Sequence, residues 1–104
     1  MGYLKDDEIG EGKKFDSDKL RFDLIPPEIT EELAKVLTMG VKKYSANNWQ
    51  NVESDRYIAA LFRHINSWRK GEIFDDESGF RHLSHALCNI AFLLWKEIHA
   101  GVTE

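Results

Sequence analysis

The apolar positions of this chain recur at helical spacing in three separate stretches. The first begins near Pro27 and runs to about Tyr44, the second ends before Gly71, and the third covers residues 79–100 and ends before Gly101. Apolar side chains three and four residues apart share one face of a helix, and glycine commonly follows a helix end. The pattern therefore predicts an all-α fold, a small bundle of three main helices.

Polar residues are expected to start the two later helices. Ser54 or Asp55 is placed to cap the second helix, and Asp76 or Ser78 the third. Their side-chain oxygens accept hydrogen bonds from the free N–H groups of a first helical turn. The predicted core face of the second helix consists of Ile58, Leu61, Phe62, Ile65 and Trp68.

The chain ahead of the first helix lacks a helical pattern. Residues 1–13 are rich in charge and glycine, which predicts a flexible N-terminal arm. Residues 14–25 are expected to be extended or looped because Pro26 and Pro27 follow them, and the residue before a proline avoids the helical region. Residues 14–104 have the length of a single helical domain.

The third helix carries a polar row beside an apolar stripe. His82, His85 and Asn89 are spaced i, i+3 and i+7, so they project from one side of the helix, and Glu77 lies just ahead of it. The neighbouring stripe, which we expect to face the core, consists of Leu83, Ala86, Leu87, Ile90, Leu93 and Leu94. A row of polar side chains beside an apolar stripe indicates a binding or catalytic site.

The third helix also has more apolar surface than two shorter helices cover. It is about 30 Å long at 1.5 Å per residue. The surplus side chains are Phe80, Phe92, Trp95 and Ile98. We expect the chain to pack this surface across a symmetry axis in a homo-oligomer. Coverage by a short fourth helix or by the N-terminal arm is the alternative.

Composition narrows the functional classes. Apolar residues make up 42% and aromatic residues 12% of the chain, as in globular proteins, and the net charge of -4 argues against binding of polymeric nucleic acid. No apolar run approaches the ~20 residues that span a bilayer, and the first residues do not resemble a signal peptide. The single cysteine, Cys88, fits a small buried residue in a cytoplasmic protein.

Histidines and acids gather around the start of the third helix. His64, at the edge of the second helix's core stripe, is expected to meet His82 and His85, and residues 75–77 are all acidic. Carboxylates clustered with histidines suit a divalent cation, which polarises a phosphate chain. Alternatively, the acids only cap the helix and the histidines are structural. The sequence contains no HExxH, no paired CxxC and no glycine-rich phosphate loop.

Cations and a polar aromatic loop complete the candidate site. Arg63 and Lys43 are candidates for binding phosphates, although Lys43 equally suits a solvated helix end. Asn48 and Trp49 are typical of a loop that stacks on a base and hydrogen-bonds its edge. The alternative is that the tryptophan covers the core.

Several segments match a known family in order and with similar spacing over residues 13–95. They are KLRFDLIPPE (19–28), VLTMGVKKY (36–44), Asn48-Trp49, Arg56-Tyr57, LFRH (61–64), WRKGE (68–72), DESG (76–79), HLSHA (82–86) and Asn89. In these segments the sequence resembles the small phage and prophage dATP/dGTP diphosphohydrolases, relatives of the MazG-like all-α nucleotide pyrophosphohydrolases.

The resemblance implies a helical oligomer, located in the host cytoplasm if phage-encoded, that binds a purine nucleotide. It implies cleavage of a (deoxy)nucleoside triphosphate to monophosphate and pyrophosphate with Mg²⁺ or Mn²⁺, and no membrane partner. The implied substrate-binding residues are Lys19, Arg21, Lys43, Asn48, Trp49, Arg63 and Asn89. Glu77, His64, His82 and His85 are the implied catalytic residues, and Glu77, His82 and His85 the implied metal ligands.

One departure from the MazG-like pattern leaves alternatives open. Those enzymes usually present a Glu-Glu-x-x-Glu helix and a Glu-x-x-Asp helix to the metals, whereas residues 31–35 read EELAK and the later helix offers His82 and His85. Mg²⁺ prefers oxygen ligands, so the change either recruits a different metal or removes metal catalysis. The alternatives to a pyrophosphohydrolase are a phage protein that sequesters a nucleotide defence signal, and a small helical interaction protein.

Overall fold

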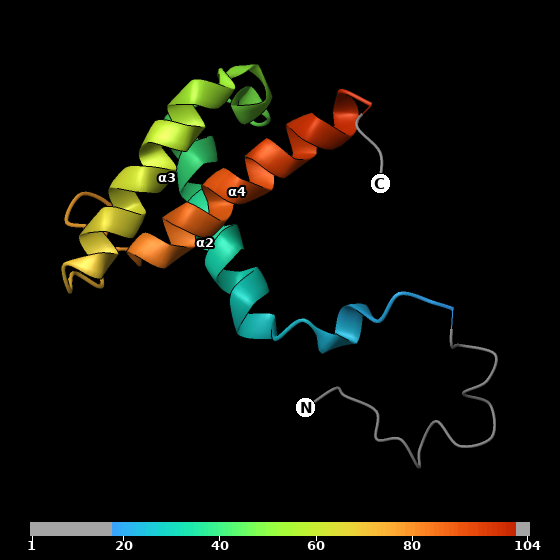
Figure 1. Cartoon of the computed structure of the whole chain (residues 1–104), viewed down its shortest axis with the longest axis horizontal. Coiled ribbons are helices and arrows are strands. Elements are labelled where there is room, and N and C mark those ends of the chain that lie inside the picture. The colour runs from blue at the N-terminus through green and yellow to red at the C-terminus, as the bar shows by residue number, and fades with distance from the viewer. Residues whose placement is uncertain (1–17, 102–104) are drawn as a thin grey trace, which may run out of the picture. The chain divides into compact units, whose positions relative to one another are not determined.

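The computed structural model describes residues 18–101, and the chain divides into two compact units, residues 1–30 and 31–104. The predicted arm of residues 1–13 lies outside the described residues. The elements are η2 Phe22–Leu24, α2 Pro27–Lys43, η3 Asn48–Asn51, α3 Ser54–Arg69 and α4 His82–His99 (Figure 1). Residues 18–101 contain no β-strand, so the predicted all-α class with three main helices is confirmed.

In the first unit the chain makes one 3₁₀ turn before α2 begins. Arg21 donates two hydrogen bonds to Asp23, from Nε to Oδ1 and from Nη2 to Oδ2, each 2.8 Å long. These bonds hold the pKa of Asp23 below its ordinary value. α2 starts at Pro27, where the missing N–H has no cost because the first helical N–H groups lack intrahelical partners.

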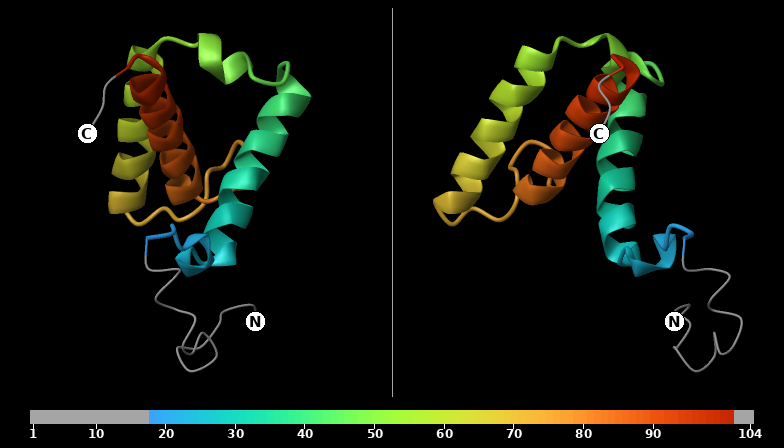
Figure 2. Two further views of the ribbon diagram at one scale, coloured as in Figure 1. Left: turned by 90° about the vertical axis from the view of Figure 1, so that its right-hand side faces the viewer. Right: turned by 45° about the vertical axis from the view of Figure 1, so that its right-hand side comes forward.

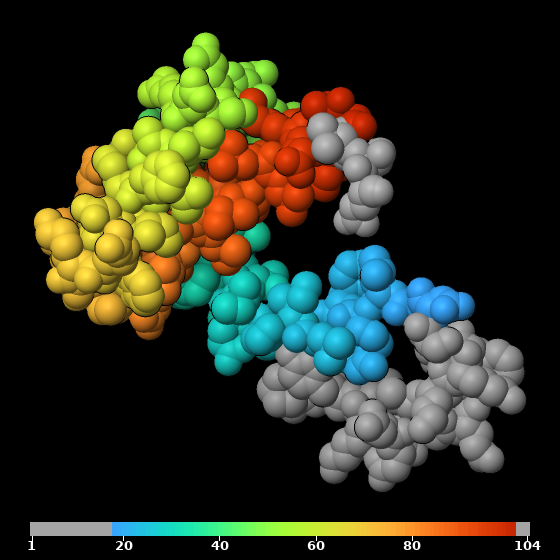
Figure 3. All heavy atoms as spheres, viewed as in Figure 1, coloured from blue at the N-terminus to red at the C-terminus, as the bar shows by residue number. Residues whose placement is uncertain are grey.

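In the second unit α3 and α4 run antiparallel, side by side (Figures 1 and 2). Residues 70–81, which we call the acidic loop, join the end of α3 to the start of α4. The atoms of the two helices form one unbroken surface in the space-filling view (Figure 3). None of the helices in the described part of the chain is long and apolar enough to cross a membrane.

Aromatic side chains attach η3 to the two antiparallel helices. The Trp49 ring stacks on Phe92 with centroids 4.7 Å apart, and it meets Trp95 edge-on at 4.8 Å. The Tyr57 hydroxyl donates a 2.5 Å hydrogen bond to the Trp49 carbonyl. Burial raises the pKa of Tyr57 to about 12, so its hydroxyl stays protonated and keeps donating. Two of the four surplus side chains of α4, Phe92 and Trp95, are thus covered within the chain.

The predicted N-caps of α3 and α4 are wrong, and α4 starts later than predicted. α3 begins at Ser54 with Glu53 at its N-cap, and α4 begins at His82 with Arg81 at its N-cap. Neither N-cap residue makes a side-chain hydrogen bond to its helix. The expected caps Ser54, Asp55, Asp76 and Ser78 therefore do not have that role.

The later start of α4 follows from hydrogen bonds within the acidic loop. Phe74 and Arg81 form an isolated antiparallel bridge, and the His82 N–H donates to the Ile73 carbonyl at 2.9 Å. Gly79, with φ of 78°, takes a left-handed conformation that other residues rarely adopt. Backbone groups used in these contacts are not free to form an earlier helical turn.

The predicted burial of α4 is partly wrong. His82 and Asn89 of the polar row are only 5% and 8% exposed, whereas Leu83 and Leu94 of the expected core stripe are 43% and 52% exposed. His82 finds a hydrogen-bond partner in His64, so this face is buried without an orphaned polar group. Of the predicted apolar stripe, Leu83, Ile90 and Leu94 remain exposed, whereas Ala86 is buried and Leu87 and Leu93 are half-buried.

The expected core face of α3 is also partly wrong. Tyr57 is buried, while Ile58, Phe62 and Trp68 are 38%, 67% and 42% exposed. Leu61 and Ile65 are intermediate. The contacts of α3 with α4 include Tyr57 with Phe92 and His64 with His82.

Candidate functional site

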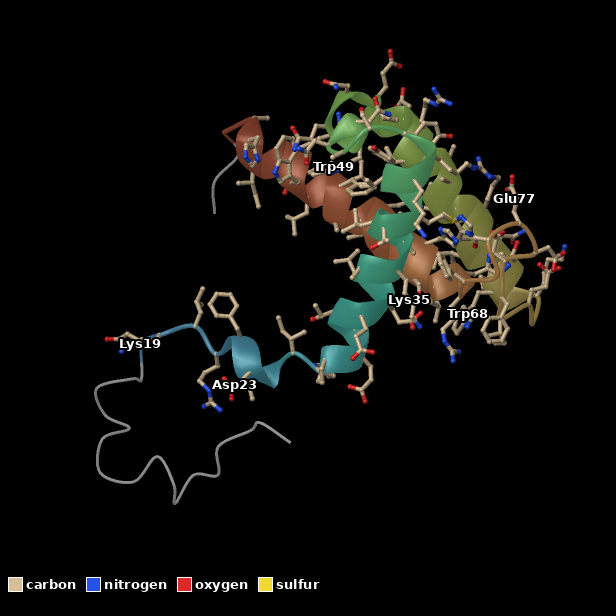
Figure 4. All side chains as sticks on the ribbon, turned by 180° about the vertical axis from the view of Figure 1, so that it is seen from behind. Lys19, Asp23, Lys35, Trp49, Trp68 and Glu77 are labelled. Carbon is tan, nitrogen blue, oxygen red and sulfur yellow. The ribbon has the colours of Figure 1, made fainter. Side chains whose placement is uncertain are left out.

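A polar cavity of about 390 Å³ lies in the second unit, bordered by α2, α3, the acidic loop and the first turn of α4. Its lining residues are Met39, Lys43, Arg63, His64, Ser67, Asp75, Glu77, Ser78, His82 and His85. Figure 4 shows Glu77 on the acidic loop and Trp49 away from it, on η3. The cavity thus brings together the catalytic candidates His64, Glu77, His82 and His85 with the phosphate-binding candidates Lys43 and Arg63.

Three histidine rings meet in this cavity. Nδ1 of His64 lies 2.9 Å from Nδ1 of His82, so one of the two nitrogens donates to the other. The ring of His85 stacks on the ring of His64, with centroids 4.6 Å apart and planes 9° from parallel. The prediction that the histidines of two helices meet in the folded chain is therefore confirmed.

The acidic loop contributes Asp75, a group that sequence reasoning passed over in favour of Glu77. Oδ2 of Asp75 accepts hydrogen bonds from the backbone N–H and the hydroxyl of Ser78, at 2.9 Å and 2.8 Å. The same hydroxyl lies 2.7 Å from Nε2 of His85. The Asp-x-x-Ser spacing of residues 75–78 is the sequence signal that could have pointed to Asp75.

Burial and hydrogen bonds shift the protonation of these groups. Burial lowers the pKa of His64, and the neighbouring His85 lowers it further. Burial also lowers the pKa of His85, against the opposing effect of Asp75. For Asp75 burial acts to raise the pKa, but the hydrogen bonds from Ser78 outweigh it and the pKa is lowered. The lowered pKa values favour the neutral form of His64 and His85 and the carboxylate form of Asp75.

One set of side chains has the geometry to share a metal ion. Ligand atoms of His64, Asp75 and His82 lie within 4.8 Å of one another. The set differs from the sequence-based ligands Glu77, His82 and His85, which share only His82 with it. Glu77 is exposed at the edge of the cavity, and the assignment of roles to Glu77 and His85 stays a prediction.

A second, largely apolar cavity of about 610 Å³ lies between α2, η3, α3 and α4. Apolar and aromatic groups form most of its wall, and the polar members include Asn48, Arg56, Arg63 and Asn89. Arg63 and Met39 line both cavities. The two cavities are therefore neighbours, one rich in ionisable groups and the other in apolar surface.

Asn89 presents an amide to the apolar cavity. Its residue is only 8% exposed, and none of its side-chain atoms makes a hydrogen bond to another described residue. An amide offers both donors and an acceptor. No buried side-chain nitrogen or oxygen among the described residues lacks a partner, so the unpaired amide atoms of Asn89 reach the cavity and are suited to the polar edge of an otherwise apolar ligand.

The remaining predicted binding residues have mixed positions. Asn48 and Trp49 line the apolar cavity, but the Trp49 ring is engaged with Phe92 and Trp95, which supports the alternative that it covers the core. Lys19 and Arg21 belong to the first unit. Their roles stay predictions.

Cys88 has the expected structural role. It is 3% exposed, and burial raises the pKa of its thiol to about 12. A thiol that stays protonated is a poor nucleophile. The structure therefore supports packing, not catalysis, for this residue.

Comparison with known proteins agrees with the resemblance. A family described as "dATP/dGTP diphosphohydrolase, N-terminal" matches residues 10–104. The chain belongs to this family. The "dATP/dGTP diphosphohydrolase" of Salmonella phage PMBT28 is 40% identical over 84 residues, which are 81% of this chain and 29% of that relative. No solved structure matches the chain.

The matched region of the dATP/dGTP diphosphohydrolase family contains both cavities, since all of their lining residues lie between 36 and 92. The chain nevertheless spans less than a third of the length of the phage relative.

Proposed function

We propose that this chain binds a purine deoxynucleoside triphosphate in the cytoplasm and hydrolyses it to the monophosphate and pyrophosphate. The observation that carries the proposal is the position of Arg63, which lines the polar and the apolar cavity alike. A guanidinium at such a boundary suits the junction between the base and sugar of a nucleotide and its phosphates.

Phosphate binding is assigned to the polar cavity. Lys43 and Arg63 supply the positive charge, and His64, His82 and His85 supply N–H groups. In the proposed reaction a water attacks the α-phosphorus, and the bond from that phosphorus to the α–β bridging oxygen breaks. Pyrophosphate leaves with the bond electrons. Glu77, which lines the cavity, is proposed as the general base that takes the proton of the water.

A divalent cation, Mg²⁺ or Mn²⁺, is proposed to assist this step. It would neutralise charge on the phosphates and stabilise the leaving pyrophosphate. The mixture of imidazole and carboxylate groups in the polar cavity supports cation binding there.

Base binding is assigned to the apolar cavity. Its volume of about 610 Å³ is in the range of ligand pockets, and Asn89 and Asn48 supply amides for the edge of a purine. The name of the phage relative, a dATP/dGTP diphosphohydrolase, supports a purine in this place.

The active form is proposed to be a homo-oligomer. On α4 the residues Leu83, Ile90, Leu94 and Ile98 are 43%, 49%, 52% and 58% exposed, and their spacing places them on one stripe. An apolar helix stripe exposed to water is unfavourable and is typical of a protein interface. A second copy of the chain supplies an identical stripe, so the two surfaces are complementary without another partner.

Sequestration of a nucleotide without cleavage is the second candidate. The ionisable wall of the polar cavity contains three histidines but only two carboxylates, Asp75 and Glu77. This composition binds phosphates well and provides few of the oxygen ligands that Mg²⁺ prefers. The same cavities would then hold a nucleotide signal and keep it intact.

The deciding experiment incubates the purified chain with each dNTP and Mg²⁺ or Mn²⁺ and separates the products by anion-exchange chromatography. In ¹⁸O-labelled water, attack at the α-phosphorus places the label in the monophosphate and leaves pyrophosphate unlabelled. Glu77→Gln is expected to abolish turnover, whereas Glu97→Gln, an exposed acid on α4, is the matched control.

The results separate the candidates. Label in pyrophosphate would contradict the proposed bond cleavage. Tight binding with intact nucleotide recovered after denaturation would replace hydrolysis by sequestration. Absence of both binding and turnover would leave the chain as a helical interaction protein.

A further inference from the structure

We infer that His64, Asp75 and His82 form a binding site for one divalent first-row transition-metal ion, and that this site prefers such an ion to Mg²⁺. The inference deepens the proposed function because it names the ion class and the ligands in the polar cavity. The three ligands come from α3, the acidic loop and α4, so they do not belong to one short sequence motif.

The distances suit a single ion. Two ligands bound at 2.0–2.1 Å in a tetrahedron lie about 3.3–3.5 Å apart. The three side chains have ligand atoms within 4.8 Å of one another, and the two Nδ1 atoms of His64 and His82 are 2.9 Å apart. Shifts of about 0.5 to 1.5 Å in side-chain position, without movement of the helices, therefore convert the hydrogen-bonded arrangement into a coordinated one.

Neighbouring groups hold each ligand in orientation. Nε2 of His82 lies 3.7 Å from Oε2 of Glu72, so that carboxylate faces the ring nitrogen opposite the one that meets His64. Metal-binding imidazoles commonly direct their second nitrogen to a carboxylate. Ser78 holds Oδ2 of Asp75 with two hydrogen bonds, which leaves Oδ1 to coordinate.

The remaining ligand, His64, is held in orientation by His85. Its ring lies flat against His64, with planes 9° from parallel, and its Nε2 is 2.7 Å from the Ser78 hydroxyl. In this position His85 supports His64 by stacking and takes no place among the ligand atoms that converge. We assign it as a positioning residue.

The ligand types set the preference among ions. Two imidazole nitrogens and one carboxylate suit Zn²⁺, Co²⁺, Ni²⁺, Fe²⁺ or Mn²⁺. Mg²⁺ demands near-octahedral oxygen ligands and keeps several of its waters. Three protein ligands next to a cavity of about 390 Å³ leave further coordination positions open to water or to a phosphate oxygen, as in catalytic metal sites.

The test measures metal binding without any nucleotide. The full chain is stripped with a chelator and titrated with Co²⁺, followed by visible absorption, and with Zn²⁺, followed by calorimetry. We expect one equivalent per chain, bound equally well when Mg²⁺ is in large excess. The Co²⁺ spectrum should be that of a low-coordinate site with nitrogen ligands.

Variants assign the ligands. His64→Gln, Asp75→Asn and His82→Gln should each weaken Zn²⁺ binding by about 100-fold or more, and Glu72→Gln by about 10-fold. His99→Gln, on the exposed end of α4, is the matched control and should bind as the parent chain does. Circular dichroism of each metal-free variant checks folding, and Asp75→Asn, which nearly preserves side-chain shape, serves where a histidine variant unfolds.

The inference is overturned if the parent chain binds no stoichiometric Co²⁺ or Zn²⁺, or if Mg²⁺ displaces them at similar concentration. It is also overturned if His85→Gln and Glu77→Gln abolish binding while His64→Gln and Asp75→Asn retain it. Metal binding without dNTP cleavage would contradict the proposed hydrolysis and leave this site intact. Cleavage of a dNTP with Mg²⁺ by a chain that binds no Co²⁺ would overturn the metal-site inference and support the proposed hydrolysis.

Discussion

The Ser84 hydroxyl on α4 donates a 2.7 Å hydrogen bond to Oε1 of Glu32 on α2. The second oxygen of Glu32 accepts a hydrogen bond from Lys35, also 2.7 Å long. Lys35 and then Ser84 lower the pKa of Glu32, so the carboxylate form is favoured. Glu32, one of the two acids in the EELAK segment of residues 31–35, therefore attaches α2 to α4.

Removing the hydroxyl should loosen this attachment. Ser84 is 4% exposed, so Ser84→Ala leaves Glu32 without a partner from α4 and is expected to lower the melting temperature by about 4–8 °C. Thermal unfolding followed by circular dichroism measures the change. Ser54→Ala, at an exposed position that makes no side-chain hydrogen bond to a described residue, is the control. Equal melting temperatures for the two variants would show that the contact does not stabilise the chain.

Arg63 should dominate phosphate binding. Arg63→Ala is expected to weaken binding of a non-hydrolysable deoxynucleoside triphosphate by about 10- to 100-fold, because a charge-assisted contact is lost. Arg63→Lys should recover part of the loss, since it restores charge but not the two-pronged geometry. Calorimetry with Arg69→Ala as control measures the effect. An unchanged affinity in Arg63→Ala would exclude the polar cavity as the phosphate site.

Asn89 should control base selection. Asn89→Leu keeps the approximate volume and removes the amide, so we expect affinity for purine nucleotides to fall by about 10-fold or more with little change for pyrimidine nucleotides. Competition binding with the four dNTPs measures the ratio. Asn66→Leu, on the exposed side of α3, is the control. A uniform loss for all four bases would indicate damage to the fold and not to base recognition.

The metal-free protein should lose stability in mild acid. His64 and His85 have lowered pKa values in the folded chain, mainly because of burial. Between the ordinary histidine pKa of about 6.5 and these lower values, the unfolded chain binds more protons, so stability falls with falling pH. Above a pH of about 6.5 the two histidines no longer reduce the stability of the folded chain. The charged or titratable groups that act on the pair are Arg63, Asp75, Glu77 and His82, and Lys43 lines the same cavity.

Urea unfolding of the chelator-treated protein at about pH 7.5 and about pH 5.5 measures this dependence. His64→Gln should reduce the difference between the two midpoints, whereas His99→Gln should not. A midpoint that is the same at both pH values would contradict the burial of neutral histidines.

The exposed apolar stripe should determine assembly. Leu94→Glu places a charge in the stripe of α4 and is expected to dissociate the oligomer into monomers, as measured by light scattering coupled to size-exclusion chromatography. His99→Gln, at an exposed position on another side of α4, is the control. A parent chain that is already monomeric at high concentration would refute the proposed homo-oligomer.

Local pattern was sufficient for much of the fold. The helical period located α2, α3 and α4, and Gly71 and Gly101, with φ of 97° and 87°, follow the ends of α3 and α4 as expected. It failed at the N-caps of α3 and α4 and at the start of α4. His82 begins its helix late because its backbone N–H pairs with Ile73 across the acidic loop, and such a contact has no signal in the helical period.

The sequence by itself determined the helical class, the family and the group of histidines and acids that would meet, because periodicity and motif order are local properties of the chain. Only the tertiary structure decided which face of α4 is buried and that Asp75, in place of Glu77, converges with His64 and His82. The first outcome depends on a hydrogen bond between residues 18 apart in sequence, and the second on a short-range hydrogen bond within the acidic loop, which the fold brings next to two helices. The His64–His82 pair allows a polar face to be buried, and Ser78 fixes the direction of the Asp75 carboxylate.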